Sequence, residues 1–240
     1  MTFLTTDTFF NGRILVLQEQ DGYRYSIDAV ILAYHAGGGS STRVLDLGTG
    51  CGIIPMILAF RDPLVRIFAV EVQASLAKLA MENIEANRMA DRVTILAEDM
   101  KTLRPEMTGG PVDLVVVNPP FYKVDTGRVN PNPQRAVARH ELRVTLSDVT
   151  ATASRMLQKG GRFLAIYTAE RLCDMIAGLR AAGIEPKWLR MIQSADHAAA
   201  GLVLVEGMKG GSPGVKIPPP LIIYDSKGRY TEEVSRMFQY

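Results

Sequence analysis

The residues best suited to chemistry in this sequence are Asn118, Pro119, Pro120 and Phe121, which directly follow the apolar segment 112–117. That segment is short, continuous and rich in β-branched residues, which predicts a strand buried on both faces. The two prolines end the strand, because proline cannot donate a hydrogen bond to a sheet. The resulting corner offers an amide side chain, backbone carbonyls and an aromatic face, which suit a planar nitrogen nucleophile such as an exocyclic amine or an amide. Taken alone, the tetrapeptide is equally typical of an ordinary turn at the end of a strand.

A glycine-rich turn lies upstream of this corner. Segment 44–52 predicts a short strand that runs into three glycines at alternate positions, before an apolar helix. Glycines permit positive φ angles and let a ligand approach the backbone beside the N-terminus of a helix. In a dinucleotide-binding fingerprint counted from Gly48, the third glycine would stand where the sequence has Ile53. A nicotinamide-dependent enzyme is therefore the weaker interpretation.

Two further predicted strands end on acidic residues. The strand at 65–70 ends on Glu71, roughly 20 residues past the glycines, where a carboxylate can bind both hydroxyls of an adenosine ribose. The strand at 93–97 is followed by Glu98 and Asp99. Ligands of open α/β sheets bind at the carboxyl ends of the strands. The glycine turn, these acidic residues and the Asn118 corner are therefore expected at one ligand-binding edge.

From residue 43 onward, predicted strands alternate with predicted helices. The best-signalled helices cover residues 74–87, 146–158 and 170–182. Thr145 and Asp148 resemble a capping box that opens the second of them. Alternating strands and helices imply a parallel sheet with right-handed crossovers. The last two predicted strands, 188–192 and 202–205, have no helix between them and should form an antiparallel hairpin.

Length and composition limit the classes of protein to which this chain can belong. The chain has 240 residues, enough for one large α/β domain, and its net charge of +2 does not by itself indicate a nucleic-acid binder. The two cysteines have no metal-binding or redox spacing, and the three histidines are scattered, so no metal site is expected. No apolar stretch approaches about 18 residues, and no signal peptide is evident. These features predict a soluble, cytoplasmic protein.

The segment 122–143, directly after the Asn118 corner, is long, polar and without strong periodicity. Its basic and imidazole side chains outnumber its two acids, Asp125 and Glu141. The candidates for contact with a polyanion are Lys123, Arg128, Arg135, Arg139 and His140. Long loops in compact domains are often functional, and cations beside an active corner would meet phosphates. The alternative is a solvated surface loop whose charges have no specific role.

The series of strand ends resembles the class I S-adenosylmethionine-dependent methyltransferases, in particular those with an Asn-Pro-Pro-aromatic motif. More closely, the chain is similar to the bacterial tRNA adenine-N6 methyltransferase family, which modifies the adenine beside the anticodon of a valine tRNA. Phe121 stands where many relatives carry Tyr, and both offer a stacking face. The segments that carry the resemblance are 7–13, 22–32, 118–122, 138–141 and 230–234.

The resemblance implies a fold and a division of the chain. The expected fold is a Rossmann-like α/β class I methyltransferase with a seven-stranded, mostly parallel sheet and an antiparallel C-terminal hairpin. The whole chain, 1–240, would be a single methyltransferase domain. Its expected parts are a cofactor-capping segment at 1–42, a catalytic core at 43–208 and a tail at 209–240 that packs on the core.

The resemblance also implies roles for individual residues. The cofactor would be S-adenosyl-L-methionine, the substrate tRNA, and the protein a monomer or weak homodimer without a metal. The catalytic residues would be Asn118, Pro119, Pro120 and Phe121. The residues implied to bind the cofactor are Tyr25, Asp28, Asp46, Gly48, Thr49, Gly50, Glu71, Val72, Asp99, Met100 and Asn118. The residues implied to bind tRNA are Lys123, Arg128, Arg135, Arg139 and His140.

Other functions share parts of this pattern. A protein-glutamine N5 methyltransferase of the release-factor type uses the same Asn-Pro-Pro chemistry, but such enzymes usually carry an N-terminal helical domain, for which residues 1–42 are too few. A guanine-N2 rRNA methyltransferase is a further enzyme alternative. From a different class, the chain could be a non-catalytic S-adenosylmethionine-binding RNA interaction module. The intact Asn118 corner argues against that reading, because a binding module would not need it.

Overall fold

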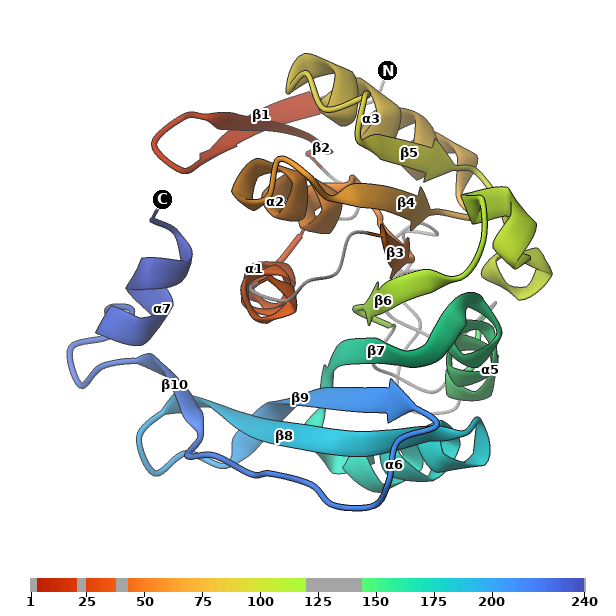
Figure 1. Cartoon of the computed structure of the whole chain (residues 1–240). Coiled ribbons are helices and arrows are strands. Elements are labelled where there is room, and N and C mark those ends of the chain that lie inside the picture. Colours follow the sequence, from red (N-terminus) through yellow and green to blue (C-terminus); the bar gives the residue numbers. More distant parts are fainter. Residues whose placement is uncertain (1–3, 21–24, 38–42, 120–143, 240) are drawn as a thin grey trace.

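The computed structural model describes residues 4–20, 25–37, 43–119 and 144–239 as a mixed sheet with helices on both faces (Figure 1). The strands are β1 (Leu4–Phe9), β2 (Ile14–Glu19), β3 (Arg43–Leu47), β4 (Arg66–Val70), β5 (Val93–Leu96), β6 (Val112–Val117), β7 (Leu157–Thr168), β8 (Ile184–Ala195), β9 (Ala200–Lys209) and β10 (Leu221–Tyr224). The α-helices are α1 (Ile27–Ala36), α2 (Ile53–Arg61), α3 (Ala74–Ala86), α5 (Leu146–Met156), α6 (Leu172–Ala181) and α7 (Glu232–Met237). The short 3-10 helices are η1 (Met100–Thr102), η2 (Pro105–Thr108) and η3 (Ala169–Arg171).

Within the described residues the main sheet has eight strands, in the order β10-β8-β9-β7-β6-β3-β4-β5. Strand β9 is antiparallel to both of its neighbours, β7 and β8, while the other adjacent pairs are parallel. The mostly parallel sheet and the antiparallel β8–β9 hairpin are therefore confirmed. The expected number of seven strands was wrong by one, because the tail segment β10 pairs in parallel with the open edge of β8.

The continuous apolar pattern of β6 reflects burial from both sides of the sheet. Leu114 and Val116 pack in the core cluster that includes residues of α1 and α2. Val115 and Val117 face the opposite cluster, to which α5 and α6 contribute. Figure 1 shows these two pairs of helices on opposite faces of the sheet. The strand that leads to Asn118 is thus rigidly enclosed, which is what a positioned corner requires.

Some predicted element boundaries shift in the structure. The capping box is confirmed, because the Thr145 hydroxyl accepts from the Asp148 N–H at 3.2 Å while the Asp148 carboxylate accepts from the Thr145 N–H at 2.9 Å. The helix was expected to reach residue 158 but ends at Met156, and Gly160 lies within β7 with a φ of 77°. Ser26 stands at the N-cap of α1, and its side chain makes no capping hydrogen bond.

The N-terminal residues form an antiparallel hairpin, β1–β2, that the sequence analysis did not anticipate. Asn83, which is fully buried on α3, holds it in place. The Asn83 side-chain oxygen accepts from the Leu17 N–H at 2.7 Å, and its amide nitrogen donates to the Leu17 carbonyl at 2.9 Å. The same nitrogen donates to the carbonyl of Cys51 at 2.8 Å. One buried amide thereby joins the hairpin to the glycine-rich turn.

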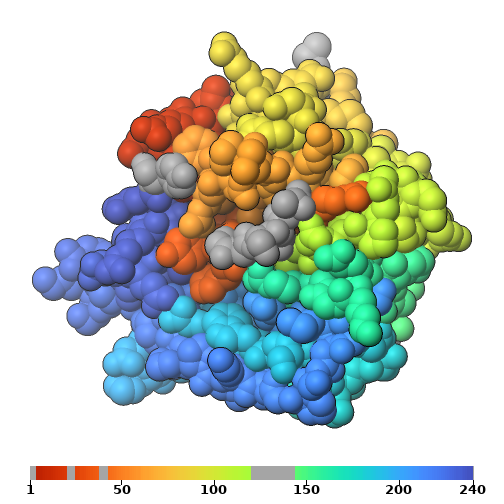
Figure 2. Space-filling model, viewed as in Figure 1, coloured from red at the N-terminus to blue at the C-terminus, as the bar shows by residue number. Residues whose placement is uncertain are grey.

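The tail also contacts the body of the protein. Val234 and Met237 of α7 are buried in the cluster that contains α1. Arg190 of β8 donates two hydrogen bonds to the Glu233 carboxylate, at 2.6 and 2.9 Å. In Figure 2 the amino-terminal hairpin (red) and the carboxyl-terminal segment (blue) lie next to each other on one face. The two ends of the chain therefore meet on the side of the sheet that α1 covers.

We expect Asn83→Leu to lower the free energy of unfolding by about 3 kcal/mol, because three buried backbone groups lose their partners at about 1–3 kcal/mol each. Urea denaturation would measure this loss. Asn87→Leu is the matched control, since Asn87 makes the same pair of bonds with Leu15 at a half-exposed position. Water can replace those bonds, so the control should lose about 1 kcal/mol or less. Equal losses in the two variants would contradict a special role for the buried amide.

Candidate active site

Three neighbouring strands bring the predicted chemical groups to one edge of the sheet. Leu47 of β3 pairs in register with Val70 of β4 and with Val117 of β6. Because all three strands are parallel, the next residue of each, Gly48, Glu71 and Asn118, follows at the same edge. Asn118 is half-buried and Pro119 is buried. The structure therefore brings together the glycine turn, the acidic residue and the amide that were predicted from separate segments.

The glycine turn has the backbone geometry that the sequence predicts. Gly48, Gly50 and Gly52 have φ angles of 76°, 59° and 88°, which disfavour residues with side chains. Among the residues that the structure describes, a Cβ added to Gly48 would meet no atom within 4 Å, so these residues leave the space beside Gly48 open. The turn therefore exposes its backbone to a ligand, directly before the first turn of α2.

Glu71 is held in a fixed orientation beside this turn. Its side chain is buried, with 6% exposure for the residue. One carboxylate oxygen accepts from the Gly50 N–H at 3.0 Å, and the other accepts from the Gln73 N–H at 2.9 Å. Burial raises the pKa of Glu71, and these backbone N–H groups oppose the shift. A carboxylate has about four acceptor positions, so it can also accept from a hydroxyl group of a ligand.

Asp46 is the most unusual group at this edge. It is fully buried, and neither carboxylate oxygen has a hydrogen-bond partner among the residues that the structure describes. Burial raises the pKa of Asp46 to about 7, and the negative charge of Glu71 acts in the same direction. The nearby Thr49 hydroxyl opposes the shift, although its geometry does not meet that of a hydrogen bond. Buried polar atoms are rarely left unsatisfied, so this carboxylate suits a cationic donor supplied by a ligand.

The start of α1 lies at the same edge. The Arg61 guanidinium of α2 stacks 4.6 Å from the ring centroid of Tyr34 in α1, so the carboxyl ends of the two helices are together. Helix α2 begins at the glycine turn, and α1, packed beside it in the same direction, begins nearby. The N-terminus of α1, with Tyr25 and Asp28, therefore lies toward the edge that carries the glycine turn. A contact of either residue with a cofactor stays a prediction. Burial raises the pKa of Asp28.

The remaining predicted cofactor residues are less directly placed. Val72 follows Glu71, and Asp99 follows β5, the outermost strand on this side of the sheet. The Asp99 carboxylate caps η1 by accepting from the Lys101 N–H at 2.9 Å, and it forms an ion pair with the Lys101 ammonium at 3.5 Å. The carbonyl of Met100 accepts from Arg155 of α5 at 3.2 Å. These two residues thus have structural roles besides any contact with a ligand.

Part of the predicted site lies outside the described residues. This applies to Pro120 and Phe121 of the corner. It also applies to the predicted tRNA contacts Lys123, Arg128, Arg135, Arg139 and His140. Within the described part of the chain, no group of three or more His, Cys, Asp or Glu residues could hold a metal ion. None of the described helices is long and apolar enough to span a membrane.

Sequence analysis missed a polar network that supports this edge. The Gln18 side chain donates to the Asp7 carboxylate at 2.7 Å and accepts from the Tyr25 N–H at 3.0 Å. It therefore links both strands of the hairpin to the residue that precedes α1. A signal for the hairpin was present, because the Asn11-Gly12 pair between two short apolar segments is typical of a tight turn. The contact between the hairpin and α1 had no local signal.

Comparisons with known proteins agree with this geometry. A family model described as methyltransferase small domain matches residues 29–176. The tRNA1(Val) (adenine(37)-N6)-methyltransferase of Porphyromonas gingivalis (strain ATCC 33277) is 29% identical over 242 residues, covering 98% of this chain and 94% of that protein. The protein of the same name from Pectobacterium carotovorum subsp. carotovorum is 30% identical over 176 residues, covering 72% of this chain and 70% of its own length.

Solved structures show the same fold. A protein from Agrobacterium tumefaciens, described as a predicted O-methyltransferase, has a TM-score of 0.70 and 21% identity, covering 88% of this chain and 94% of its own. TYW2 of P. horikoshii, solved in complex with MeSAdo, has a TM-score of 0.60 and 15% identity, covering 88% of this chain and 73% of its own. At these identities the likeness establishes a Rossmann-like methyltransferase fold and carries no residue roles.

The raised pKa of Asp46 predicts a pH dependence of stability in the absence of ligand. The native state retains this proton up to about pH 7, whereas an unfolded chain loses it near a pKa of about 3.9. The folded state therefore binds more protons in this range, and stability falls as pH rises from about 4 to about 7.

We expect Asp46→Asn to remove this fall, so that its stability advantage over the wild type grows between about pH 4 and 7 and is constant above. Each unit of pKa shift corresponds to about 1.4 kcal/mol. Denaturant titrations at several pH values would measure it. A difference between the two proteins that does not change with pH would contradict the assignment.

Proposed function

Because the chain belongs to the methyltransferase small domain family and to the family of tRNA1(Val) (adenine(37)-N6)-methyltransferases, we propose that it methylates N6 of an adenine in tRNA, in the cytoplasm. It is an S-adenosylmethionine-dependent methyltransferase. The observation that carries the proposal is the edge at which the glycine turn after β3 lies between Glu71, after β4, and Asn118, after β6. In the relatives named above, the modified base is adenine 37 of tRNA1(Val).

The described residues fit the cofactor. The Asp46 carboxylate, which has no hydrogen-bond partner among the described residues, suits the ammonium of the methionine moiety. The half-buried Asp28, at the start of α1, would contribute a second negative charge. The fixed Glu71 carboxylate suits the two ribose hydroxyls, because hydroxyls can donate to its remaining acceptor positions. The open side of Gly48 admits a ligand close to the backbone. When bound, S-adenosylmethionine supplies an electrophilic methyl group on a sulfonium.

Asn118 and Pro119 would prepare the nucleophile. The lone pair of adenine N6 is delocalised into the ring, so this nitrogen is a poor nucleophile. If the Asn118 side-chain oxygen and the Pro119 carbonyl accept its two hydrogens, N6 can become pyramidal and direct its lone pair at the methyl group. Positioning and preorganised electrostatics then supply most of the acceleration. The N6 proton is lost to water after transfer, so no strong general base is required.

The target adenine must leave its own stack to reach this edge. We propose that Phe121, which follows the two prolines, stacks on the displaced base. Pro120 would keep the corner rigid, since its ring fixes the backbone φ angle. Both roles rest on the sequence, because these two residues lie outside the described part of the chain.

Asn118→Ala should lower methyl transfer to tRNA by about 100-fold or more, because it removes an acceptor that acts on the reacting amine. Cofactor affinity, measured by calorimetry, should change little. Radiolabelled methyl transfer to tRNA followed by nucleoside analysis would measure activity and would distinguish adenine N6 from guanine N2. Transfer to a release factor in place of tRNA would indicate the glutamine N5 alternative.

Glu71→Ala is the control variant for the same experiment, because it should change cofactor affinity, which Asn118→Ala should leave nearly unchanged. It removes a charge-assisted contact, so cofactor affinity should fall by about tenfold or more. Near-normal methylation by Asn118→Ala would overturn the proposed mechanism. Unchanged cofactor affinity in Glu71→Ala would remove that residue from the cofactor site.

We propose that the basic segment after the corner binds tRNA phosphates. Replacing both Arg135 and Arg139 with alanine should raise the KM for tRNA and flatten its dependence on salt, since fewer counterions are released on binding. Cofactor affinity should stay unchanged. Steady-state kinetics at several salt concentrations would test this. Loss of cofactor binding with intact tRNA binding would instead make the segment part of the cofactor site.

A further inference from the structure

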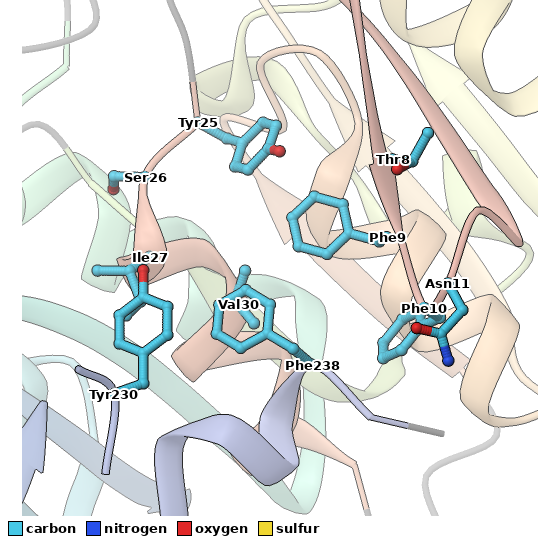
Figure 3. A pocket seen from close by; sticks show the side chains of 10 residues that line it. All are labelled: Thr8, Phe9, Phe10, Asn11, Tyr25, Ser26, Ile27, Val30, Tyr230 and Phe238. Atoms are coloured by element: carbon cyan, nitrogen blue, oxygen red, sulfur yellow. The ribbon is translucent and has the colours of Figure 1, made fainter.

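The two faces of the main sheet are held by different kinds of contact. On the face that α1 covers, the ring of Phe9 from the N-terminal hairpin stacks on that of Phe238 from the tail, with centroids 6.0 Å apart and an angle of 10° between the planes (Figure 3). On the opposite face, α5 contacts the loop after β5 through hydrogen bonds. That loop contains η1 and follows Asp99, which is predicted to bind the cofactor.

Arg155 of α5 holds this loop by its backbone. Its Nε donates to the carbonyl of Leu103 at 2.8 Å, and one terminal nitrogen donates to the carbonyls of Met100 and Lys101 at 3.2 and 3.1 Å. Among the described residues, no carboxylate pairs with this guanidinium. Burial and the nearby charge of Arg104 lower the pKa of Arg155, but an arginine in a protein stays protonated. The planar fork of a guanidinium suits several acceptors at once.

Thr152, on the same helix, adds to this contact. Its side chain is buried, and its hydroxyl donates to the Met100 carbonyl at 3.2 Å while it accepts from Arg155 at 3.1 Å. A threonine inside a helix commonly bonds back to its own helix, as Thr150 does with the carbonyl of Ser147 at 3.2 Å. Thr152 instead donates to a segment 52 residues away in the sequence.

The segment held by Arg155 and Thr152 carries Asp99 in a fixed orientation. The Asp99 carboxylate accepts from the Lys101 N–H at 2.9 Å, and the Asp99 carbonyl accepts from the Thr102 N–H at 2.9 Å. A movement of η1 would therefore move the carboxylate with it. The Asp99 side chain is 37% exposed, so a ligand can still reach it.

Asp99 lies on the side of Glu71 that faces away from Asn118. The Glu71 N–H donates to the carbonyl of Leu96 in β5 at 3.0 Å, whereas β6 lies on the other side of β4, beyond β3. S-adenosylmethionine carries its purine on one side of the ribose and its methyl-bearing sulfur on the other. If Glu71 binds the ribose hydroxyls and the methyl group faces Asn118, the purine points toward the loop after β5.

We propose that Arg155, assisted by Thr152, is a positioning residue for the purine end of the cofactor site. It acts through η1, which it holds so that the Asp99 carboxylate accepts from the exocyclic amino group of the adenine. Arg155 thereby contributes to the preference for adenine over a base with an oxygen at that position. The proposal rests on the proposed function, because it requires a cofactor that contains adenosine.

Two ligands that differ at this position give a readout of the carboxylate. S-adenosylhomocysteine has an amino group there, and S-inosylhomocysteine has a carbonyl oxygen. Calorimetry on the wild type should show tighter binding of S-adenosylhomocysteine by about tenfold or more, because the oxygen cannot donate to Asp99. Asp99→Ala should bring the two affinities to within about twofold of each other, since neither ligand then meets a carboxylate.

Arg155→Met removes all the donors of the side chain at similar length. The ratio of the two affinities should fall by about threefold or more, toward that of Asp99→Ala. Arg155→Lys keeps the charge but not the fork, so it should lose less. Arg104→Met is the matched control, because the exposed Arg104 bonds only to carbonyls of its own segment. Its ratio should stay within about twofold of the wild type.

A purely structural role for Arg155 predicts a different result. Loss of folded protein weakens the binding of both ligands equally, so their ratio would not change. In the double variant Asp99→Ala/Arg155→Met the ratio should equal that of Asp99→Ala, because Arg155 acts through Asp99. Thermal unfolding would show which variants are folded. If Arg155→Met does not fold, Arg155→Gln, which also lacks the guanidinium fork, takes its place with the same expected fall.

The failure of this proposal is distinct from failure of the proposed function. If the wild type methylates tRNA and Arg155→Met keeps the full ratio, the positioning role is wrong and the function stands. If the wild type methylates tRNA but binds both ligands equally, Asp99 does not contact the base and the proposal falls. If the expected ratios are found but no tRNA is methylated, the proposal stands and the function falls. If the wild type binds neither ligand, both are overturned.

Discussion

The parallel pairing of β3 with β4 and β6 is the constraint on which the rest of the site depends. It sets Gly48, Glu71 and Asn118 in one row, although they are far apart in the sequence. The hydrogen bond from Gly50 to the Glu71 carboxylate then ties the turn after β3 to the end of β4. A shift of either pairing by one residue would take the three residues out of this row, and it would turn the buried side chains of the shifted strand to the other face of the sheet. The ladder hydrogen bonds thus determine the geometry of a cofactor site beside a nucleophile-binding corner.

The site is kept at a cost in stability. Asp46 is a carboxylate without a hydrogen-bond partner among the described residues, in a place where burial strongly disfavours its charge. An apolar residue of similar size would suit the folded protein better in the absence of a ligand. A group that is unsatisfied until a cationic donor arrives gains its full interaction only on binding. This is how an active site can favour its ligand at the expense of the empty protein.

Both ends of the chain support the edge that they flank. Asn83 and Gln18 connect the hairpin to the glycine turn and to Tyr25, and α7 packs against α1 through Val234 and Met237. Helix α1 is therefore held by the N-terminal and C-terminal segments together. If Asp28 at the start of α1 contacts the cofactor, as proposed, substitutions in either terminal segment will affect the site without contacting it. The stacked rings of Phe9 and Phe238 lie where these two segments meet.

The sequence by itself determined the local features of this protein. The β-branched run before Asn118 marked β6, the alternate glycines marked a turn with positive φ, and Thr145 with Asp148 marked the start of α5. Each of these depends on neighbouring residues, through side-chain shape, backbone freedom or capping, and can be read without the fold. The resemblance carried by segments 7–13, 22–32 and 118–122 supplied the family and hence the cofactor. Whether each named residue contacts cofactor or tRNA stays a prediction.

Only the tertiary structure decided what depends on contacts between distant segments. The tail segment β10 forms the eighth strand because β8 has an open edge with which it can pair. The four residues of β10 do not by themselves indicate that pairing. The position of the hairpin depends on its hydrogen bonds with the buried amide of Asn83. The contact between the two ends of the chain depends on the stacking of Phe9 on Phe238, which are far apart in the sequence. The raised pKa of Asp46 also depends on tertiary structure. The sequence shows an aspartate within an apolar strand, but it does not show whether the folded protein provides a hydrogen-bond partner for that carboxylate. The burial of a side chain and its hydrogen-bond partners are properties of the folded chain. They determine whether the residues of a sequence motif form a binding site.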